Sequence, residues 1–584
     1  MILPMLLLLA TLGGGTAAPE AGELRSYDLQ PLLVPYHAEF ELQVLPCRGA
    51  GPGSEEREHL DAGLVIELVR ALCSPEFEYE GRMLQESGGA LYVTAPAAVQ
   101  ERVARILAFL GSALATHTDV LVDELLFPEP LGKDPAALLT PEEAQKLISG
   151  AGPHRAWKLQ LRPGWAGAAL SLRSISFVSD WNVEIAQGAA IYDPIVDCIP
   201  VGDALVCSGA SAPGGLWLAL LARCAESSGP KDHPLEVSAT VASDASPIQN
   251  PQPNGPTARA GGRVLQAGPR LWQSVPVSLH GLALNTFLPD GKVLCVSATL
   301  GVGEQKSTRL LLVRRAGTST APVQGLAFDP KGSGGRDLVL VDGGWLRPPY
   351  CALEGDLRGG GALPQLIESE QGPLKAFLHA ADTSRAHELL QTTSGCDVFD
   401  SSAWLVLVRS PRPVEGSGLE AALTRLGAGA PTPQAYSVEL ALRRGGTLVA
   451  RSSLALRSGV ASSVVAGAED QLLADWDVEV AQFAAVGDPQ IRESFEGLCA
   501  HLRVDRDGAG GVLLDIRAFG QVRSGELRNL DPQVPTVGPM SQGSWDRLGI
   551  EERVTLGGEG AKKVGFGDTG GNGLMLEVTL NELK

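Results

Sequence analysis

Residues 180–194 read DWNVEIAQGAAIYDP, and residues 475–489 read DWDVEVAQFAAVGDP. Ten of the fifteen positions are identical without a gap, an agreement that chance does not produce within one chain. The sequence therefore contains an internal duplication, and its two copies predict one unit built twice.

The duplication extends upstream of these segments. Residues 90–111 read ALYVTAPAAVQERVARILAFLG, and residues 403–427 read AWLVLVRSPRPVEGSGLEAALTRLG. Each copy predicts a strand, a break at Pro and a helix closed by Gly. Another helix and another strand are predicted before each segment, at 63–75 and 76–84 in the first copy and at 384–395 and 396–401 in the second. With a further strand at Tyr27–Leu33, the first copy has the order β-α-β-β-α, a small sheet covered by two helices. The first-copy helix places apolar residues at amphipathic spacing: Val99, Val103, Ile106, Leu107 and Leu110.

A strand-rich module follows each small domain. Val120–Phe127 and Tyr436–Arg444 are strands in the same place of the two copies. In the first copy Thr140, Pro141 and Glu143 predict a helix start with a capping box, and the second copy lacks this helix. We therefore predict the α+β class, as a duplicated unit of a small βαββα domain and a β-rich module.

Composition and charge exclude some partners. The 584 residues include 44% hydrophobic residues, so packed cores are expected, and 70 Gly with 40 Pro suit many short strands and turns. The net charge is −20 without a basic cluster. Nucleic acid is therefore not expected as a partner, because its affinity depends on Lys and Arg. An anionic membrane surface is disfavoured for the same reason.

The N-terminus resembles a signal peptide. An apolar stretch, Leu6–Leu12, is followed by small residues up to Ala18, which predicts cleavage near residue 18 and an exported protein. No basic residue precedes the apolar stretch and Pro19 follows it, so a mis-chosen start or a frayed terminus is the alternative. No other segment has 18 continuous apolar residues, and no transmembrane helix is predicted.

Two of the nine cysteines have a suggestive spacing. Residues 195–207 read IVDCIPVGDALVC. If Gly202-Asp203 were a two-residue hairpin turn, Cys198 and Cys207 would face each other at a non-hydrogen-bonded position. A Cys198–Cys207 disulfide is then predicted for an exported protein, with two free thiols as the alternative.

No catalytic, cofactor or metal constellation can be named from the sequence. The nine His are scattered without a paired ligand spacing, and DRDGAGGVLLD at 505–515 is too short for a calcium loop. We therefore predict no enzyme activity, no cofactor, no metal and no small-molecule substrate. The repeated motif supplies the candidate site residues, which are either core anchors or partner contacts: Trp181, Glu184, Gln187, Trp476, Glu479 and Gln482.

The order of elements resembles that of bacterial secretins of type II and type III secretion systems. The resemblance rests on VLVDELLF (Val120–Phe127), then LLTPEEAQKLIS with its EEAQ element, then the strands through LPDGKVLCVSATLG. It implies small N-domains, which stack in rings and dock partners, followed by a secretin domain. The chain departs from the family because it has two such modules and no Val-Pro-Gly-Leu-Gly-like gate segment.

The resemblance gives the expected domain boundaries. They are a signal peptide at 1–18, a first N-domain at 24–118, a first secretin-like β module at 119–315, a linker with a second N-domain at 316–430, and a second β module at 431–584.

We expect a secretin-like envelope component in the periplasm or at the outer membrane, either a channel or a ring scaffold. Its partners would be copies of itself or other envelope and secretion proteins, since open sheet edges need pairing. The alternative is a monomeric periplasmic binding or structural protein that keeps the fold without a pore. An exported hydrolase is a third alternative.

Overall fold

The computed structural model describes residues 22–33, 35–43, 53–58, 61–114, 117–161, 166–186, 189–212, 214–235, 238–242, 262–266, 270–301, 306–317, 323–326, 338–342, 350–354, 375–379, 397–401, 405–409, 434–481, 484–506, 511–530, 540–556, 561–567 and 573–583. The predicted signal peptide lies outside these residues. None of the described helices is long and apolar enough to cross a membrane.

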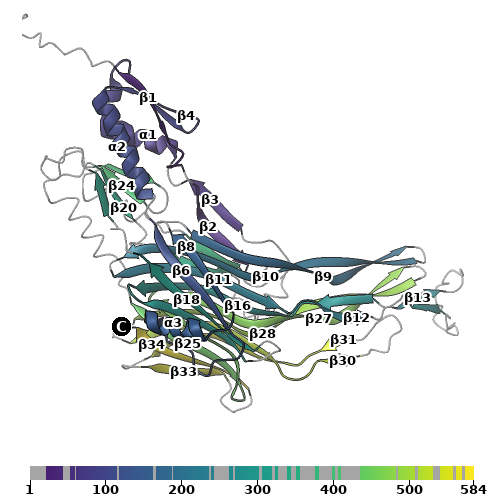
Figure 1. Cartoon of the computed structure of the whole chain (residues 1–584). Helices are drawn as coiled ribbons and strands as arrows, with labels where there is room; N and C mark the ends of the chain where they lie inside the picture. The colour runs from purple at the N-terminus through teal and green to yellow at the C-terminus, as the bar shows by residue number, and fades with distance from the viewer. Residues whose placement is uncertain are drawn as a thin grey trace, which may run out of the picture.

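The N-terminal region packs two helices beside a three-stranded antiparallel sheet of order β1-β5-β4 (Figure 1). The elements are β1 (Glu23–Asp28), α1 (Ala62–Cys73), η1 (Glu76–Glu78), β4 (Met83–Ser87), β5 (Ala90–Ala95) and α2 (Ala97–Leu114). Asp61 caps α1 by accepting a bond from the Leu64 N–H. The apolar face predicted for α2 is formed: Val103, Ile106 and Leu110 are buried against α1 and the sheet.

Two more small sheets join segments that are far apart in the chain. One has the order β21-β22-β2-β3 and the other has the order β19-β20-β24-β23. Their strands are β2 (Pro35–Gln43), β3 (Gly53–Glu58), β19 (Val323–Leu326), β20 (Leu338–Asp342), β21 (Tyr350–Glu354), β22 (Lys375–His379), β23 (Asp397–Ser401) and β24 (Leu405–Arg409). Both helices predicted for the second small domain, near 384–395 and 418–427, lie outside the described residues.

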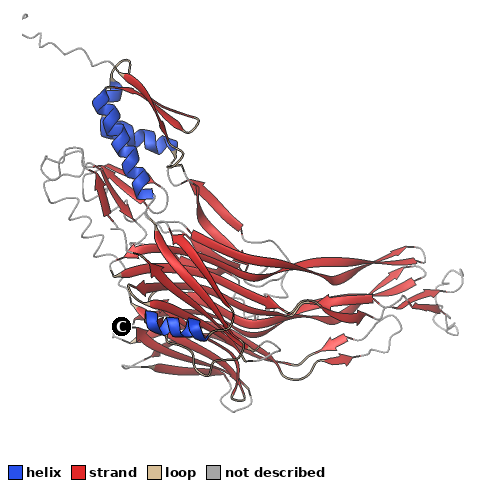
Figure 2. Ribbon diagram, in the orientation of Figure 1, coloured by secondary structure: helices blue, strands red, loops and turns tan. Residues whose placement is uncertain are grey.

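Two large antiparallel sheets form the body of the molecule (Figures 1 and 2). The long-strand sheet has the order β9-β10-β11-β16-β27-β28-β29-β32, with β13 and β14 added at the far end of β28. Its strands are β9 (Ala166–Ala186), β10 (Ala189–Ala212), β11 (Gly215–Ser227), β13 (Ser238–Ala242), β14 (Gly262–Gln266), β16 (Val277–Pro289), β27 (Ser462–Ala481), β28 (Ala484–Arg506), β29 (Val512–Arg523) and β32 (Trp545–Leu556).

The short-strand sheet has the order β8-β6-β18-β17-β26-β25-β34-β33, with β7 beside β17. Its strands are β6 (Thr118–Phe127), β7 (Leu138–Leu139), β8 (His154–Leu161), β17 (Val293–Leu300), β18 (Ser307–Ala316), β25 (Ala435–Arg444), β26 (Thr447–Arg457), β33 (Lys562–Gly567) and β34 (Leu574–Leu583). Two-stranded ribbons accompany the sheets: β12 (Lys231–Leu235) with β15 (Arg270–Ser274), and β30 (Arg528–Leu530) with β31 (Met540–Gln542).

The inner faces of the two sheets enclose one apolar core. Alternate residues of each strand point into it, as period-2 packing requires, and they include Leu218, Leu284, Val438, Leu454 and Leu576. The helix α3 (Pro141–Gly150) covers the outer face of the short-strand sheet near β7. It begins with the predicted capping box, in which the Thr140 side chain and Glu143 satisfy each other's backbone N–H groups.

The duplication is visible in the order of strands. Apart from β13, β14 and β7, each large sheet consists of four strands from residues 118–316, called unit 1, followed by four strands from residues 435–583, called unit 2. Strands β8-β6-β18-β17 of unit 1 occupy the same places as β26-β25-β34-β33 of unit 2. In the other sheet β9-β10-β11-β16 correspond to β27-β28-β29-β32. The two units therefore share both sheets and a common core.

The predicted α+β class with a duplicated βαββα domain is wrong. The described residues contain three α-helices and one 3₁₀ turn, against thirty-four strands. The error arises because segments that look like short strands and turns fuse into single strands, such as β10 and β28. At the Gly202-Asp203 dipeptide, read as a hairpin turn, β10 continues without reversal. Gly202 has φ 120°, and a Cβ there would meet the Ser171 carbonyl oxygen at 2.1 Å, so glycine permits the close passage of the strands.

His501 on β28 contributes to the pH dependence of stability at a position where unit 1 has Val206. Its Nδ1 lies 2.8 Å from the Ser463 hydroxyl. Burial, followed by the Arg517 guanidinium, lowers the pKa of His501. The folded state therefore keeps this imidazole neutral, while the unfolded chain protonates it below about pH 6.5. The contribution of the neutral His501 to the free energy of unfolding is therefore fully present above about pH 6.5. It is lost as the pH falls from there through the folded-state pKa.

We expect His501→Val to reduce the loss of stability between pH 6.5 and acid pH. The equivalent residue in unit 1 is Val206, which is fully buried, so the fold accepts valine at this place. The measurement is urea unfolding of the wild type and variant at several pH values. An unchanged pH dependence would contradict this role of His501.

Candidate functional site

The repeated motif lies on the outer arms of two long hairpins, β9–β10 and β27–β28 (Figure 1). Trp181 is half-buried, and its indole N–H donates to the Leu271 carbonyl of β15. Trp476, its counterpart, is buried. In both copies the preceding aspartate accepts a 2.8 Å bond from the Trp backbone N–H. The two Trp therefore help to fix each arm.

The remaining motif candidates lie partly or wholly outside the described residues. Glu184 and Glu479 stand opposite Ile191 and Val486 in the ladders, but their side chains are not described. Gln187 and Gln482 lie outside the described residues altogether. Their roles stay predictions.

The predicted Cys198–Cys207 disulfide is not formed. Both residues lie on the single strand β10, nine positions apart, which separates them by about 30 Å in an extended chain. Cys198 is an exposed free thiol opposite Ser176, and Cys207 is a buried free thiol opposite Gly167. The prediction was wrong because it needed a turn at Gly202, where the strand continues.

The joint between the units pairs an edge of unit 1 with an edge of unit 2 in both sheets. In the long-strand sheet β16 pairs with β27, and in the short-strand sheet β17 pairs with β26. Asn285 N–H donates to the Ser462 hydroxyl, and the Ser452 hydroxyl donates to the Ser297 carbonyl. The unit 1 edge (β16 and β17) and the unit 2 edge (β27 and β26) lie at opposite ends of the repeated unit. The joint is therefore heterologous, or head-to-tail.

A buried ion pair fastens this joint. Arg451 of β26 lies 2.8 Å from Asp134, which comes from the unit 1 segment before α3. The same guanidinium donates to the Leu131 and Gly132 carbonyls. Burial raises the pKa of Asp134 even though Arg451 opposes this effect.

The same two kinds of edge remain open at the ends of the sheets. Within the part of the chain that the structure describes, β8 pairs with β6 alone and β33 with β34 alone, while β32 pairs only with β29. The first half of β9 likewise pairs only with β10. We call β8 with the first half of β9 the leading edge, and β32 with β33 the trailing edge.

Burial confirms that these strands are open while their counterparts are covered. Leu170 on β9 is 47% exposed, whereas Val465, which holds the same place on β27, is 1% exposed. On the trailing edge, β32 alternates between exposed and half-buried residues, while its counterpart β16 is buried almost throughout. A groove of about 520 Å³ runs beside the leading edge and is lined in part by Arg155, Arg173 and Asp203.

The comparisons with known proteins are sparse. No family model and no curated protein matches the chain. Three matching solved structures contain InvG, the secretin of the Salmonella SPI-1 type III secretion injectisome.

The InvG matches cover about half of this chain. The InvG secretin-domain β-barrel matches at 10% identity with a TM-score of 0.20, over 50% of this chain and 85% of that chain. The near-atomic InvG structure matches at 11% identity with a TM-score of 0.22, over 52% and 89%. The basal-body structure of InvG, PrgH and PrgK gives the same identity and score, over 52% of this chain and 63% of that chain.

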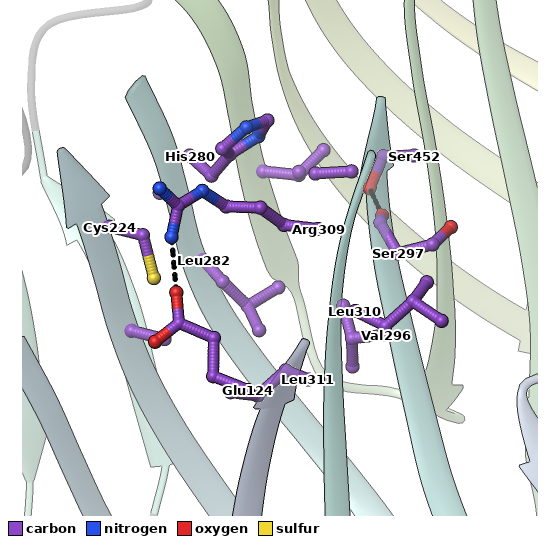
Figure 3. Close-up of a pocket in the computed structure, with 14 residues that line it drawn as sticks. Glu124, Cys224, His280, Leu282, Val296, Ser297, Arg309, Leu310, Leu311 and Ser452 are labelled. Atoms are coloured by element: carbon purple, nitrogen blue, oxygen red, sulfur yellow. Dashed lines mark hydrogen bonds and ion pairs between the residues drawn. The ribbon is translucent and has the colours of Figure 1, made fainter. Parts of the chain in front are cut away.

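A second feature is buried between the sheets of unit 1, close to the joint (Figure 3). It is named here the unit 1 charge cluster and consists of Glu124 of β6, Asp203 of β10, Cys224 of β11, His280 of β16 and Arg309 of β18. Asp203, Cys224 and His280 stand in one row across neighbouring strands, because Asp203 faces Cys224 and Cys224 faces His280 in the ladders. Glu124 and Arg309 come from the opposite sheet, and Figure 3 shows them beside Cys224 and His280.

Arg309 supplies the positive charge of the cluster. Its guanidinium forms ion pairs with Glu124 and Glu226 and lies 3.6 Å from Asp203. Asp203 also pairs with Arg155, which is half exposed at the groove. Burial works against the charge of Arg309, but its anionic neighbours raise its pKa overall.

The other members of the cluster are neutral or incompletely paired. Burial, followed by the nearby Arg309, lowers the pKa of His280 to about 3, so the imidazole is neutral at physiological pH. Neither ring nitrogen of His280 has a hydrogen-bond partner among the described residues, and the same is true of Glu124 Oε2. Burial raises the pKa of the Cys224 thiol. No local motif marks these residues, since each comes alone on a different strand.

Proposed function

We propose that this chain is an exported, secretin-like envelope component without catalytic activity, which assembles with copies of itself into a ring scaffold. The observation that supports self-assembly is the joint between the units. One chain already contains a trailing edge of unit 1 paired with a leading edge of unit 2. A second copy can repeat that pairing at each end, because the same edges are open there.

The internal joint predicts the register of the joint between chains. Within the chain Val277 faces Glu469 and Ala283 faces Ser463. The equivalent pairs place Trp545 of one copy opposite Ser174 of the next, and Glu551 opposite Ala168.

The same register brings Asp546 opposite Arg173, and opposite charges on facing positions favour this pairing over a shifted one. A heterologous joint that repeats closes into a ring when the rotation between units allows, and otherwise extends as a filament.

Localisation and partners follow from the sequence. The predicted signal peptide and the resemblance to secretins favour the periplasm or the outer membrane, with other envelope or secretion proteins as further partners. The alternative is a monomer in which the internal joint has replaced the joints of a ring. The internal ion pair gives some support to this alternative. Asp134 comes from a unit 1 segment that unit 2 replaces with the turn Gly445-Gly446. A joint between chains would therefore lack this ion pair.

The test is the absolute mass of the purified protein by light scattering after gel filtration, with and without detergent. We expect particles many times heavier than the 61.0 kDa chain, followed by ring-shaped images in the electron microscope. A strictly monomeric protein at micromolar concentration would refute self-assembly and leave the monomeric scaffold.

A further inference from the structure

One edge of the unit 2 arm is occupied by a strand that comes from unit 1. β13 pairs antiparallel with the start of β28, with Ala239 opposite Val486 and Val241 opposite Ala484. It lies on the side of β28 on which β29 pairs further along, since β27 occupies the other side. Figure 1 shows β13 at the outer end of the arm. The accepting residues, 484–486, belong to the repeated motif.

The equivalent edge of unit 1 has no strand beside it in the part of the chain that the structure describes. β10 pairs with β11 only from Gly202 to Ala212, so residues 189–201 pair with β9 alone. The segment that corresponds to 484–486 is 189–191, which reads AAI where unit 2 reads AAV. The residue types that accept β13 in unit 2 are therefore present in unit 1, in the same register of the hairpin.

The exposure of the side chains distinguishes the two edges. Just beyond the accepting segment of unit 1, Pro194 and Val196 are exposed, and the exposed fraction of Val196 is 59%. Their counterparts at the same ladder positions of unit 2, Pro489 and Ile491, are buried and half-buried. A strand edge with free backbone groups and apolar side chains beside it is a template for pairing with another strand.

The joint proposed above between copies does not fill this edge. β13 and β14 lie in residues 236–269 of unit 1, between β12 and β15, and each contains five residues. The corresponding segment of unit 2, between β30 and β31, is residues 531–539. Two strands of that length and a turn do not fit into this segment, so unit 2 of a preceding copy supplies no equivalent of β13. The edge of β10 is therefore left open both in a monomer and in a ring.

We propose that residues 189–193 of β10 form a docking site for an extended segment of a partner polypeptide, which adds to the sheet as an antiparallel strand. Backbone N–H and C=O groups supply the affinity of such a contact, and alternate side chains supply its specificity. The sequence of β13, SATVA, indicates the chemistry of the occupant: small and β-branched residues without charge.

The neighbours of the site add two further requirements. In the register of β13, the partner residue just before its SATVA-like segment lies opposite Asp193, which is exposed. A basic residue at that place is favoured, because opposite charges on facing positions attract. Pro194 limits the length of the ladder, because proline has no N–H to donate.

The probe for this site is a synthetic peptide of residues 236–243 with a fluorescent label, whose binding to the purified full chain is followed by fluorescence anisotropy. We expect saturable binding of one peptide per chain. The chain's own β13 should keep its place on β28, because a tethered strand competes at a high effective concentration. Absence of saturable binding would overturn the proposal.

A photo-crosslinker in place of Ser238 of the peptide then maps the site by mass spectrometry. We expect attachment to β9 or β10. Attachment to β28 would show that the peptide only displaces β13, and attachment elsewhere would show another site. Either result would overturn the proposal. The wild-type chain is used throughout, so no outcome depends on the folding of a variant.

Two matched peptides test whether the contact is a strand ladder. One is N-methylated at Ala239 and Val241, and the other is N-methylated at Ser238, Thr240 and Ala242. Alternate N–H groups of a strand point to opposite sides, so only one of the two peptides loses the N–H groups that face β10. We expect that peptide to bind about tenfold more weakly or worse, and the other to bind within about twofold of the parent. Equal binding or equal loss for both would contradict strand addition.

Discussion

The variant Leu170→Lys is expected to remain folded and to run as a single chain of 61.0 kDa instead of an assembly. Leu170 lies on the leading edge and is 47% exposed in the isolated chain, so lysine there should change the free energy of unfolding by less than about 0.5 kcal/mol. In the joint between chains the same side chain would be as buried as Val465 is in the internal joint. An ammonium group buried without a partner strongly opposes that contact.

Light scattering and urea unfolding of this variant test the two halves of the expectation. The control is Val196→Lys, which changes a 59% exposed residue on β10 outside the proposed register. We expect the control to assemble like the wild type. If Leu170→Lys assembled normally, or if Val196→Lys dissociated as well, the proposed joint would be wrong even if the protein forms large particles.

The variant Arg451→Ala is expected to lower the free energy of unfolding by about 3–5 kcal/mol. It leaves the Asp134 carboxylate buried without its cation, which is the costly way to break a buried ion pair. It also leaves the Leu131 and Gly132 carbonyls without their donor. Because the pair fastens unit 1 to unit 2, both units should lose stability together, as measured by urea unfolding at pH 7.

Two further variants separate the ion pair from general damage. The double variant Arg451→Met with Asp134→Leu removes both charges and should recover most of the loss, since apolar replacement of a buried pair is often neutral or better. Arg503→Ala breaks an exposed pair with Asp505 and should cost at most about 1 kcal/mol. A loss for Arg451→Ala no larger than that for Arg503→Ala would show that the pair does not hold the joint.

Local patterns in the sequence determined several elements correctly. The repeat at 180–194 and 475–489 predicted a duplication, and both copies form equivalent long hairpins. The capping box at Thr140 and Glu143 lies where it was predicted. A capping box depends on interactions between residues a few positions apart, so a short stretch of sequence is enough to predict it.

The same local evidence failed at Gly202. A Gly-Asp pair suits a hairpin turn, but it also suits a strand that passes close to a neighbouring backbone, and only the packed neighbour Ser171 decides between them. The predicted disulfide and part of the error in fold class follow from this one choice. Cys198 and Cys207 are thus separated by a strand that continues through the predicted turn.

The sequence by itself determined that this protein contains one unit built twice, and it located the capping box that begins α3. Only the tertiary structure decided that the two units share continuous sheets, that edges of the same two kinds end those sheets in the described part of the chain, and that five residues between Glu124 and Arg309 meet in one buried cluster. The physical reason is that strand pairing and sheet packing join residues far apart in the chain. Which strand pairs with which depends on how much apolar surface whole strands bury, and no short sequence motif records that.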